Sequence, residues 1–162
     1  MTGNFVINHA GRPAAVLAEL RRVLRPGARL ALTCWTEPPP PVLSLARAAI
    51  EAAGVPWPQD VPVPPFRPYS SPDAFAALLA DAGFTGATAR LVNWEHRVDP
   101  QEWWQVYRAQ VGSNGAVIAR QDDATIERIK TEFDRLAARY AAGDGMIALP
   151  ATAVLASGTR PS

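Results

Sequence analysis

A helix, a two-residue turn and a short apolar strand follow one another near the start of this chain, and they constrain its fold most. The helix is predicted over residues 12–25, because Pro13 suits a first helical turn and apolar residues then recur at three- and four-residue spacing. This apolar face consists of Val16, Leu17, Leu20, Val23 and Leu24. Pro26-Gly27 ends the helix, and Gly27 is free to adopt a positive φ. The apolar run 28–35 fits a strand that helices cover on both faces, as in a parallel sheet, and residues 4–7 hint at a preceding strand. The pattern predicts an α/β fold.

Residues 37–72 differ in character, because most of the 16 prolines lie there. Proline fixes φ and removes a backbone donor, so we expect a stiff, extended excursion, interrupted by one helix over residues 42–53. Trp57, Phe66 and Tyr69 are costly to leave in water, which argues against a disordered linker. We interpret 37–72 as a proline-rich insert or lid, folded over an end of the sheet, within a single domain of residues 1–162.

The second half of the chain contains clear signals for the ends of helices and strands. Ser71 is the expected N-cap of a helix that ends at Gly83, and residues 88–98 form the expected strand. Asp99 opens a further helix in the form of a capping box, and Asp122 or Asp123 caps a longer one. The glycines of 143–145 predict a turn before a closing strand over residues 146–157.

Composition excludes several classes of function. Lys and Arg number 16 against 15 for Asp and Glu, which gives no general attraction to nucleic acid or anionic membranes. The single Cys34 rules out an internal disulfide and fits a cytoplasmic protein. With only His9 and His96 and no paired-cysteine motif, we expect no metal site, and no run approaches the ~20 apolar residues of a membrane span. The abundance of Ala, Arg and Pro suggests a bacterial source.

Two motifs resemble class I S-adenosylmethionine (SAM)-dependent methyltransferases of the ubiquinone/menaquinone-biosynthesis branch. Residues 19–28 (Glu-Leu-Arg-Arg-Val-Leu-Arg-Pro-Gly-Ala) resemble the Glu-Leu-x-Arg-Val-Leu-x-Pro-Gly-Gly signature, with Ala28 in place of the second glycine. Residues 78–84 (Leu-Leu-Ala-Asp-Ala-Gly-Phe) resemble the family's Leu-Leu-x-x-Ala-Gly-Phe segment. The resemblance covers nearly the whole chain and concerns the C-terminal part of the family. It implies a truncated Rossmann-like methyltransferase fold, in which helices flank a small mixed sheet.

The resemblance implies methyl transfer by ancestry, with SAM as cofactor. In the family a glycine-rich loop after the first strand holds SAM, whereas the one Gly-x-Gly here, at 143–145, follows a helix and precedes a strand. We therefore expect the chain alone to bind SAM poorly or not at all. Because the apolar strand 28–35 would lack a neighbour on one side, we expect a homodimer or a separately encoded N-terminal half to cover it.

The resemblance also suggests site residues. It places Asn4 and Phe5 beside the methionine end of SAM and His9 in the reaction cavity, where His9 could act as a base. In the alternative interpretation Asn4 and Asn8 are turn formers and His9 is a helix-entry residue. Trp35 closes its strand at the carboxyl edge, where open α/β sheets bind ligands. The remaining candidates for contact with a small hydrophobic or aromatic substrate lie in lid segments: Trp57, Tyr69, Trp103, Trp104 and Tyr107.

Several alternatives stay open from the sequence. The lid aromatics could be core residues, and because adjacent helix positions point about 100° apart, we expect one of Trp103 and Trp104 to be fully buried. The protein could be longer than these 162 residues, through a misplaced start. It could also be a cofactor-independent binding protein or enzyme, such as a cyclase, derived from a methyltransferase.

Overall fold

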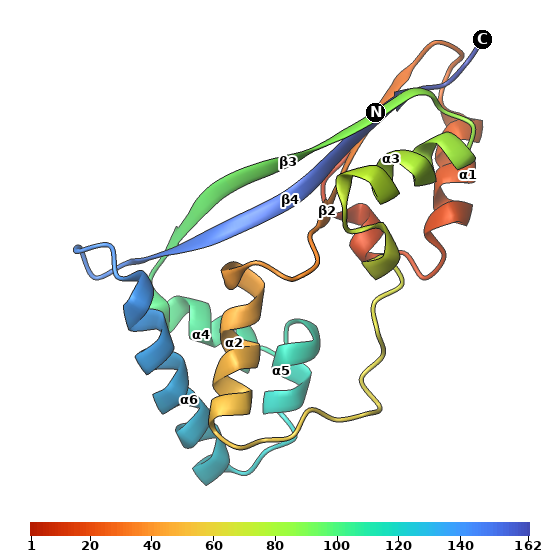
Figure 1. Cartoon of the computed structure of the whole chain (residues 1–162). Coiled ribbons are helices and arrows are strands. Elements are labelled where there is room, and N and C mark those ends of the chain that lie inside the picture. Colours follow the sequence, from red (N-terminus) through yellow and green to blue (C-terminus); the bar gives the residue numbers. More distant parts are fainter. The chain divides into compact units, whose positions relative to one another are not determined.

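The computed structural model describes all 162 residues and divides the chain into two compact units. The first unit contains Met1–Pro40, Val63–Asn93 and Thr152–Ser162. The second unit contains Pro41–Pro62 and Trp94–Ala151. Two long strands, β3 (Thr85–Val98) and β4 (Ile147–Thr159), contribute residues to both units (Figure 1).

The sheet is mixed, with strand order β1-β2-β4-β3. Strand β2 (Arg29–Trp35) pairs in parallel with the two-residue β1 (Thr2–Gly3) and antiparallel with β4 along all of its length. The Thr85 hydroxyl donates to the Thr159 carbonyl, and the Thr152 hydroxyl donates to the Asn93 side-chain oxygen. From the first contact to the second, the residue number rises along β3 and falls along β4, so the two strands are antiparallel. The predicted α/β fold with a small mixed sheet and flanking helices is confirmed.

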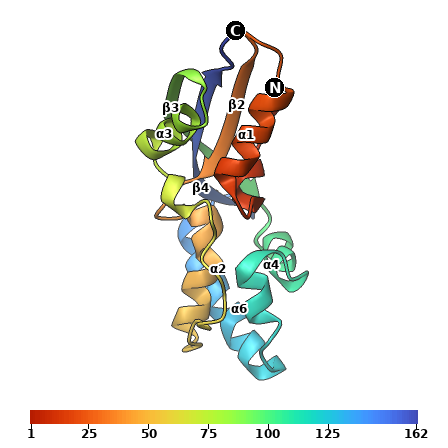
Figure 2. The ribbon, with the colours of Figure 1, turned by 90° about the vertical axis from the view of Figure 1, so that its right-hand side faces the viewer.

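Helices α1 (Pro13–Val23) and α3 (Pro72–Asp81) cover the same face of the first unit's sheet (Figure 2). The core lies between these helices and β2 and β4. Its central side chains are Ile7, Leu17, Leu30, Leu32, Phe75, Leu79 and Val154.

Local signals fix the ends of these helices as the sequence predicts. The Ser71 hydroxyl accepts a hydrogen bond from the Ala74 N–H, which satisfies an unpaired donor at the start of α3. Gly27 and Gly83 have φ angles of +76° and +82°, so a side chain at either position would strain the backbone.

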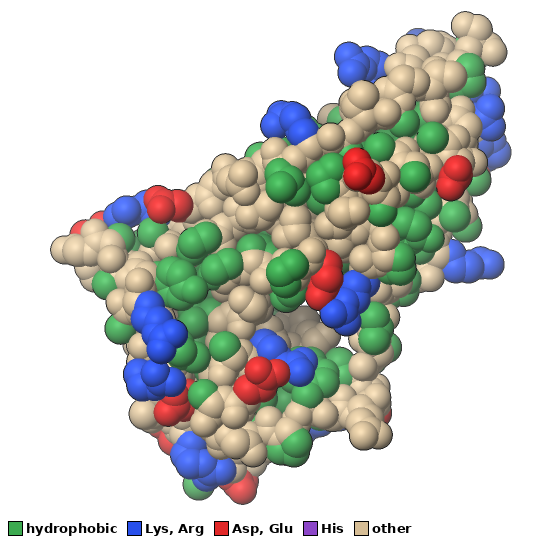
Figure 3. Space-filling view, viewed as in Figure 1, with side chains coloured by type: hydrophobic (Ala, Val, Ile, Leu, Met, Phe, Trp, Pro, Cys, Tyr) green, Lys and Arg blue, Asp and Glu red, His purple; other side chains and the backbone are tan.

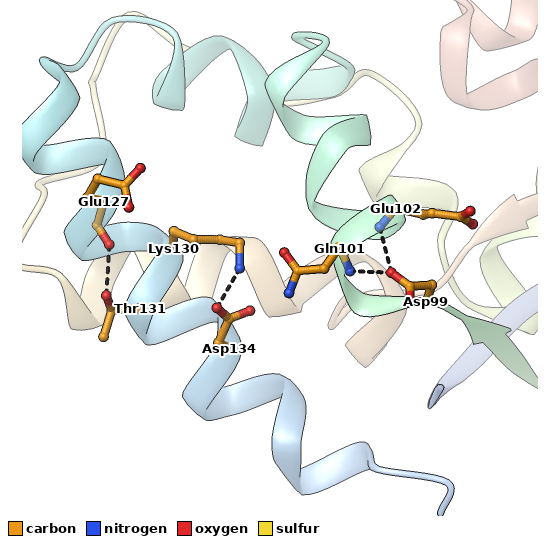
Figure 4. A network of polar contacts seen from close by, with 7 residues as sticks. All are labelled: Asp99, Gln101, Glu102, Glu127, Lys130, Thr131 and Asp134. Carbon is orange, nitrogen blue, oxygen red and sulfur yellow. Dashed lines mark hydrogen bonds and ion pairs between the residues drawn. The ribbon is translucent and has the colours of Figure 1, made fainter. Parts of the chain in front are cut away.

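The second unit is helical and contains α2 (Pro41–Ala52), α4 (Pro100–Arg108), α5 (Gly112–Ile118) and α6 (Asp123–Ala137). Helix α2 packs against α6, and α4 packs against both α5 and α6. The Asp99 carboxylate accepts hydrogen bonds from the N–H groups of Gln101 (2.7 Å) and Glu102 (3.0 Å), which caps α4 (Figure 4). The predicted insert helix is therefore α2, one of the helices of this unit.

Five expectations need correction. Strand β2 does not lack a neighbour on one side, because β1 pairs with part of it and β4 pairs with its whole length. Residues 4–7 are not a strand: pairing with β2 places the strand at Thr2–Gly3, and a 3₁₀ helix, η1, spans Val6–His9. Strand β2 is not covered on both faces within its unit, because α1 and α3 share one face. Val23, expected on the buried face of α1, is 49% exposed, since it lies in the last turn. Helix α5 has no apolar stripe in the sequence and was not predicted.

Charged side chains of both signs are interspersed over the face shown in Figure 3, with apolar surface between them. No helix is long and apolar enough to cross a membrane.

Candidate functional site

Three of the residues suggested by the sequence meet at the carboxyl end of β2. The rings of Phe5 and Trp35 stack with centroids 4.1 Å apart and an interplanar angle of 16°. Asn4 directly precedes Phe5 in the segment that joins β1 to η1. In an open α/β sheet, ligands bind outside the carboxyl ends of the strands, so this aromatic pair is suitably placed for recognition of a planar group.

Thr33 holds this segment against β2. Its hydroxyl accepts a hydrogen bond from the Phe5 N–H (2.9 Å) and donates one to the Asn4 side-chain oxygen (2.6 Å). Phe5 has a φ of 55°, in the left-handed region that a bulky residue adopts at a cost of roughly 1–2 kcal/mol. The surrounding contacts therefore maintain a conformation that the backbone alone disfavours, as is common at functional sites.

Asn8 carries an unsatisfied amide. Both polar atoms of its side chain, Nδ2 and Oδ1, are buried and have no hydrogen-bond partner. Such a group costs about 1–3 kcal/mol and usually has a reason to be present. His9, the last residue of η1, is exposed, so its imidazole is open to solvent or to a ligand.

Cys34 is unsuited to nucleophilic chemistry. Its side chain is fully buried, and its Sγ donates to the Tyr69 carbonyl at 3.6 Å. Burial raises the pKa of the Cys34 thiol to about 12, so the reactive thiolate is scarce at neutral pH. Tyr69, in the 3₁₀ helix η2 (Arg67–Tyr69), packs against the core of the first unit.

The other aromatic candidates belong to the second unit. Trp57 lies under the Arg47 guanidinium, 3.6 Å from the ring centroid. Trp104 and Tyr107 are 4% and 6% exposed and pack against Phe133, so they form part of this unit's core. Trp103 is partly buried beside His96, in agreement with the expectation that only one of the adjacent tryptophans is fully buried. The role of these four aromatic residues as substrate contacts stays a prediction.

Burial also governs the ionisation of Tyr107. Burial raises the pKa of the Tyr107 hydroxyl, an effect that the nearby Trp103 indole partly offsets. A tyrosine held neutral in this way cannot act as a base. No group of three or more His, Cys, Asp and Glu side chains is arranged to hold a metal ion.

No protein-family model and no curated protein matches the chain. Among solved structures, BH2331 of Bacillus halodurans, described as a candidate methyltransferase, is similar over 99% of this chain at 17% identity, with a TM-score of 0.47. The YcgJ protein of Bacillus subtilis is similar over 99% of this chain at 15% identity, with a TM-score of 0.49. Phosphoethanolamine N-methyltransferase 2 of Haemonchus contortus, in complex with SAM, is similar over the same share at 10% identity, with a TM-score of 0.43.

This chain spans 63% of the length of the two Bacillus proteins and 33% of the Haemonchus enzyme. The chain resembles the C-terminal part of class I SAM-dependent methyltransferases.

Sequence reasoning missed two residues of this candidate site. Thr33 is the one hydroxyl residue in the apolar run 28–35, and that exception was a usable signal. Asn8 was interpreted only as a turn former, because nothing in the sequence shows that its amide is buried without a partner.

Proposed function

We propose that this chain forms one wall of a SAM-dependent methyltransferase site and that a second polypeptide segment completes the site. The observation that carries the proposal is the Phe5–Trp35 stack at the carboxyl end of β2, anchored through Thr33. An aromatic surface with a few polar groups suits a ligand that combines a flat base with polar substituents. Asn4 and Phe5 are the proposed cofactor contacts. Trp35 is the proposed substrate contact, and it also holds the Phe5 ring by stacking against it, so its loss should weaken binding of both ligands.

The second segment is proposed because this chain has no loop of the kind that holds a nucleotide. The chain has no glycine-rich loop between a strand and a helix. Such a loop lets backbone N–H groups approach a nucleotide. In addition, β1 is an edge strand, and no strand pairs with its outer side. A second copy or a separately encoded segment would supply the missing donors.

His9 is the proposed base, and Asn8 is its polar neighbour. A base needs a positioned substrate proton as well as a suitable pKa, so His9 would act only in the completed site. The buried amide of Asn8 would gain a partner when a polar ligand group reaches it, which would relieve the cost of leaving it unpaired.

The proposed wall can be tested by saturation-transfer NMR, which detects weak ligands. With the wild-type protein we expect saturation of the adenine protons of S-adenosylhomocysteine (SAH), and we expect the signal to disappear in Trp35→Leu. Trp57→Leu is the matched control, because Trp57 lies in the second unit and stacks with Arg47. Equal signals from the two variants would contradict the proposed wall.

The same aromatic pair also supports a second candidate, a cofactor-independent protein that binds a small aromatic molecule. A flat ligand can stack on Phe5 and Trp35 without any glycine-rich loop. With 1-naphthoate as the probe, this function predicts saturation that depends on Trp35 while SAH gives none. Saturation by SAH would favour the methyltransferase-like function.

A further inference from the structure

One face of the first unit's sheet carries none of that unit's helices. Leu30, Leu32 and Cys34 of β2 point into the core under α1 and α3, so the alternating residues 29, 31, 33 and 35 point to the opposite face. On β4, Leu155 and Ser157 lie on this same face, because Val154 and Ala156 belong to the core. In the two ribbon views α1 and α3 lie together on the other side (Figures 1 and 2). We call this side the outer face.

The outer face carries positive charge only. Arg29 of β2 lies on it, and so does Arg90 of β3, because Ala87 and Ala89 pack towards the core. Both arginines are exposed, and neither forms an ion pair. The unit as a whole contains eight arginines and four acidic residues, and Glu19 and Glu37 are already paired with Arg22 and Arg67.

A hollow of about 340 Å³ indents the outer face at its β1 side. Ala31 and Leu155 provide apolar lining, Ser157 provides a hydroxyl, and Arg29 stands at the edge. Ala31, Leu155 and Ser157 are only partly buried, so apolar surface here remains in contact with water. The combination of an apolar floor and an unpaired guanidinium suits an occupant that is apolar on one side and acidic beside it.

We propose that the outer face docks an amphipathic, acidic helix of a second polypeptide. The backbone groups of the central strands are already paired in the sheet, so an occupant of this face must satisfy its own backbone hydrogen bonds, as a helix does. Its apolar stripe packs over Ala31 and Leu155, and its carboxylates pair with Arg29 and Arg90. The inference rests on the proposed function, because it names the chemistry of the segment that completes the site.

The face can be tested with the intact protein and two model peptides. One is a 20-residue helical peptide with a Leu/Ala stripe flanked by Glu, and the other has Lys in place of every Glu. With methyl-labelled leucines, the acidic peptide is expected to shift the Leu155 signals and leave those of Leu79, in the core under α3, unchanged. The basic peptide is expected to shift neither.

Charge reversal supplies the specificity test. Arg29→Glu/Arg90→Glu is expected to weaken binding of the acidic peptide roughly tenfold and to create binding of the basic one. Arg12→Glu/Arg25→Glu makes the same change in net charge at exposed positions flanking α1, and it should leave both affinities unchanged.

Three outcomes would overturn the proposal: binding of neither peptide at millimolar concentration, equal weakening by both double variants, or shifts of Leu79 in place of Leu155. A fourth outcome would also overturn it: dimerisation of the wild-type protein that Arg29→Glu/Arg90→Glu abolishes would assign the face to a second copy of the chain. The peptide titrations contain no SAM or SAH. Their failure is thus distinct from a failure of the Phe5–Trp35 wall, which the SAH experiment reports separately.

Discussion

At the scale of single residues, Thr33 joins two segments that lie 28 residues apart in sequence. Its one hydroxyl satisfies the Phe5 N–H and donates to Asn4, so it fixes the left-handed turn that presents the Phe5 ring to Trp35. A valine has nearly the same shape but no hydroxyl. The contribution of this residue can therefore be measured without opening a cavity.

Thr33→Val should lower the free energy of unfolding by about 1–3 kcal/mol, because the Phe5 N–H and the Asn4 oxygen lose their partner. Urea denaturation measures this difference. Thr88→Val, at an exposed position of β3 whose side chain makes no hydrogen bond, should stay within about 0.5 kcal/mol of wild type. Similar values for the two variants would show that the Thr33 hydroxyl does not hold the site together.

Cys34 makes stability depend on pH in the alkaline range. The folded protein raises the pKa of this thiol to about 12, whereas an unfolded thiol titrates near 8.5. The stabilisation from keeping the thiol neutral is complete below about pH 8.5 and is lost as pH rises, by at most about 1.4 kcal/mol per pH unit.

Urea unfolding at pH 7, 8.5 and 9.5 should show this decline in the wild-type protein and a flatter profile in Cys34→Ala. Both proteins keep the buried Tyr107, so the difference between the two profiles reports the thiol. Alkylation by iodoacetamide should likewise be slow until the chain is unfolded, since the thiol is buried. A reactive native thiol at pH 8 would contradict the burial of Cys34.

At the scale of elements, the start of α6 shows how much a single cap matters. The sequence leaves Asp122 and Asp123 equivalent, but the structure makes Asp122 the N-cap, where its carboxylate accepts a hydrogen bond from the Thr125 N–H at 2.7 Å. This bond is the main reason that the pKa of Asp122 lies below its usual value. Asp123 occupies the first helical position and makes no such bond.

Asp122→Ala should therefore lower the thermal midpoint clearly at pH 7, whereas Asp123→Ala should lower it only slightly. Because the folded pKa of Asp122 is depressed, its contribution is present above the unfolded pKa near 3.9 and is lost as pH falls through the folded value. The two variants should consequently converge in acid. Scanning calorimetry of the pair at pH 7 and pH 3 checks both statements, and an equal loss at pH 7 would contradict the assignment of the cap.

At the scale of the whole molecule, the sequence predicts what local chemistry decides. Helix α3 begins after its serine cap and ends at Asp81, just before Gly83, and β2 follows Pro26-Gly27, because capping residues and positive-φ glycines act over a few positions. Helix α5 was not predicted, because Gly112 and Gly115 lower the helix propensity of this segment. A Cβ at Gly115 would lie 2.7 Å from the Gln110 backbone, so this glycine is required by packing that no local pattern reveals.

The site was predictable only in part, for a related reason. Trp35 could be placed because it ends a strand, and strand ends have a defined position in an α/β sheet. Trp104 and Tyr107 could not be assigned between pocket and core, because a helical stripe looks the same in both cases until its neighbours are known. The partnerless amide of Asn8 likewise depends on contacts from distant parts of the chain.

The measurement that tests the central claim most directly is a calorimetric titration of the purified chain with SAH. A one-sided site, formed by Phe5 and Trp35 without a glycine-rich loop, predicts no saturable heat below about 1 mM ligand, which corresponds to a binding free energy weaker than about −4 kcal/mol. Micromolar binding that Trp35→Leu abolishes would contradict the claim, because it would show that this chain forms a complete cofactor site without a second segment.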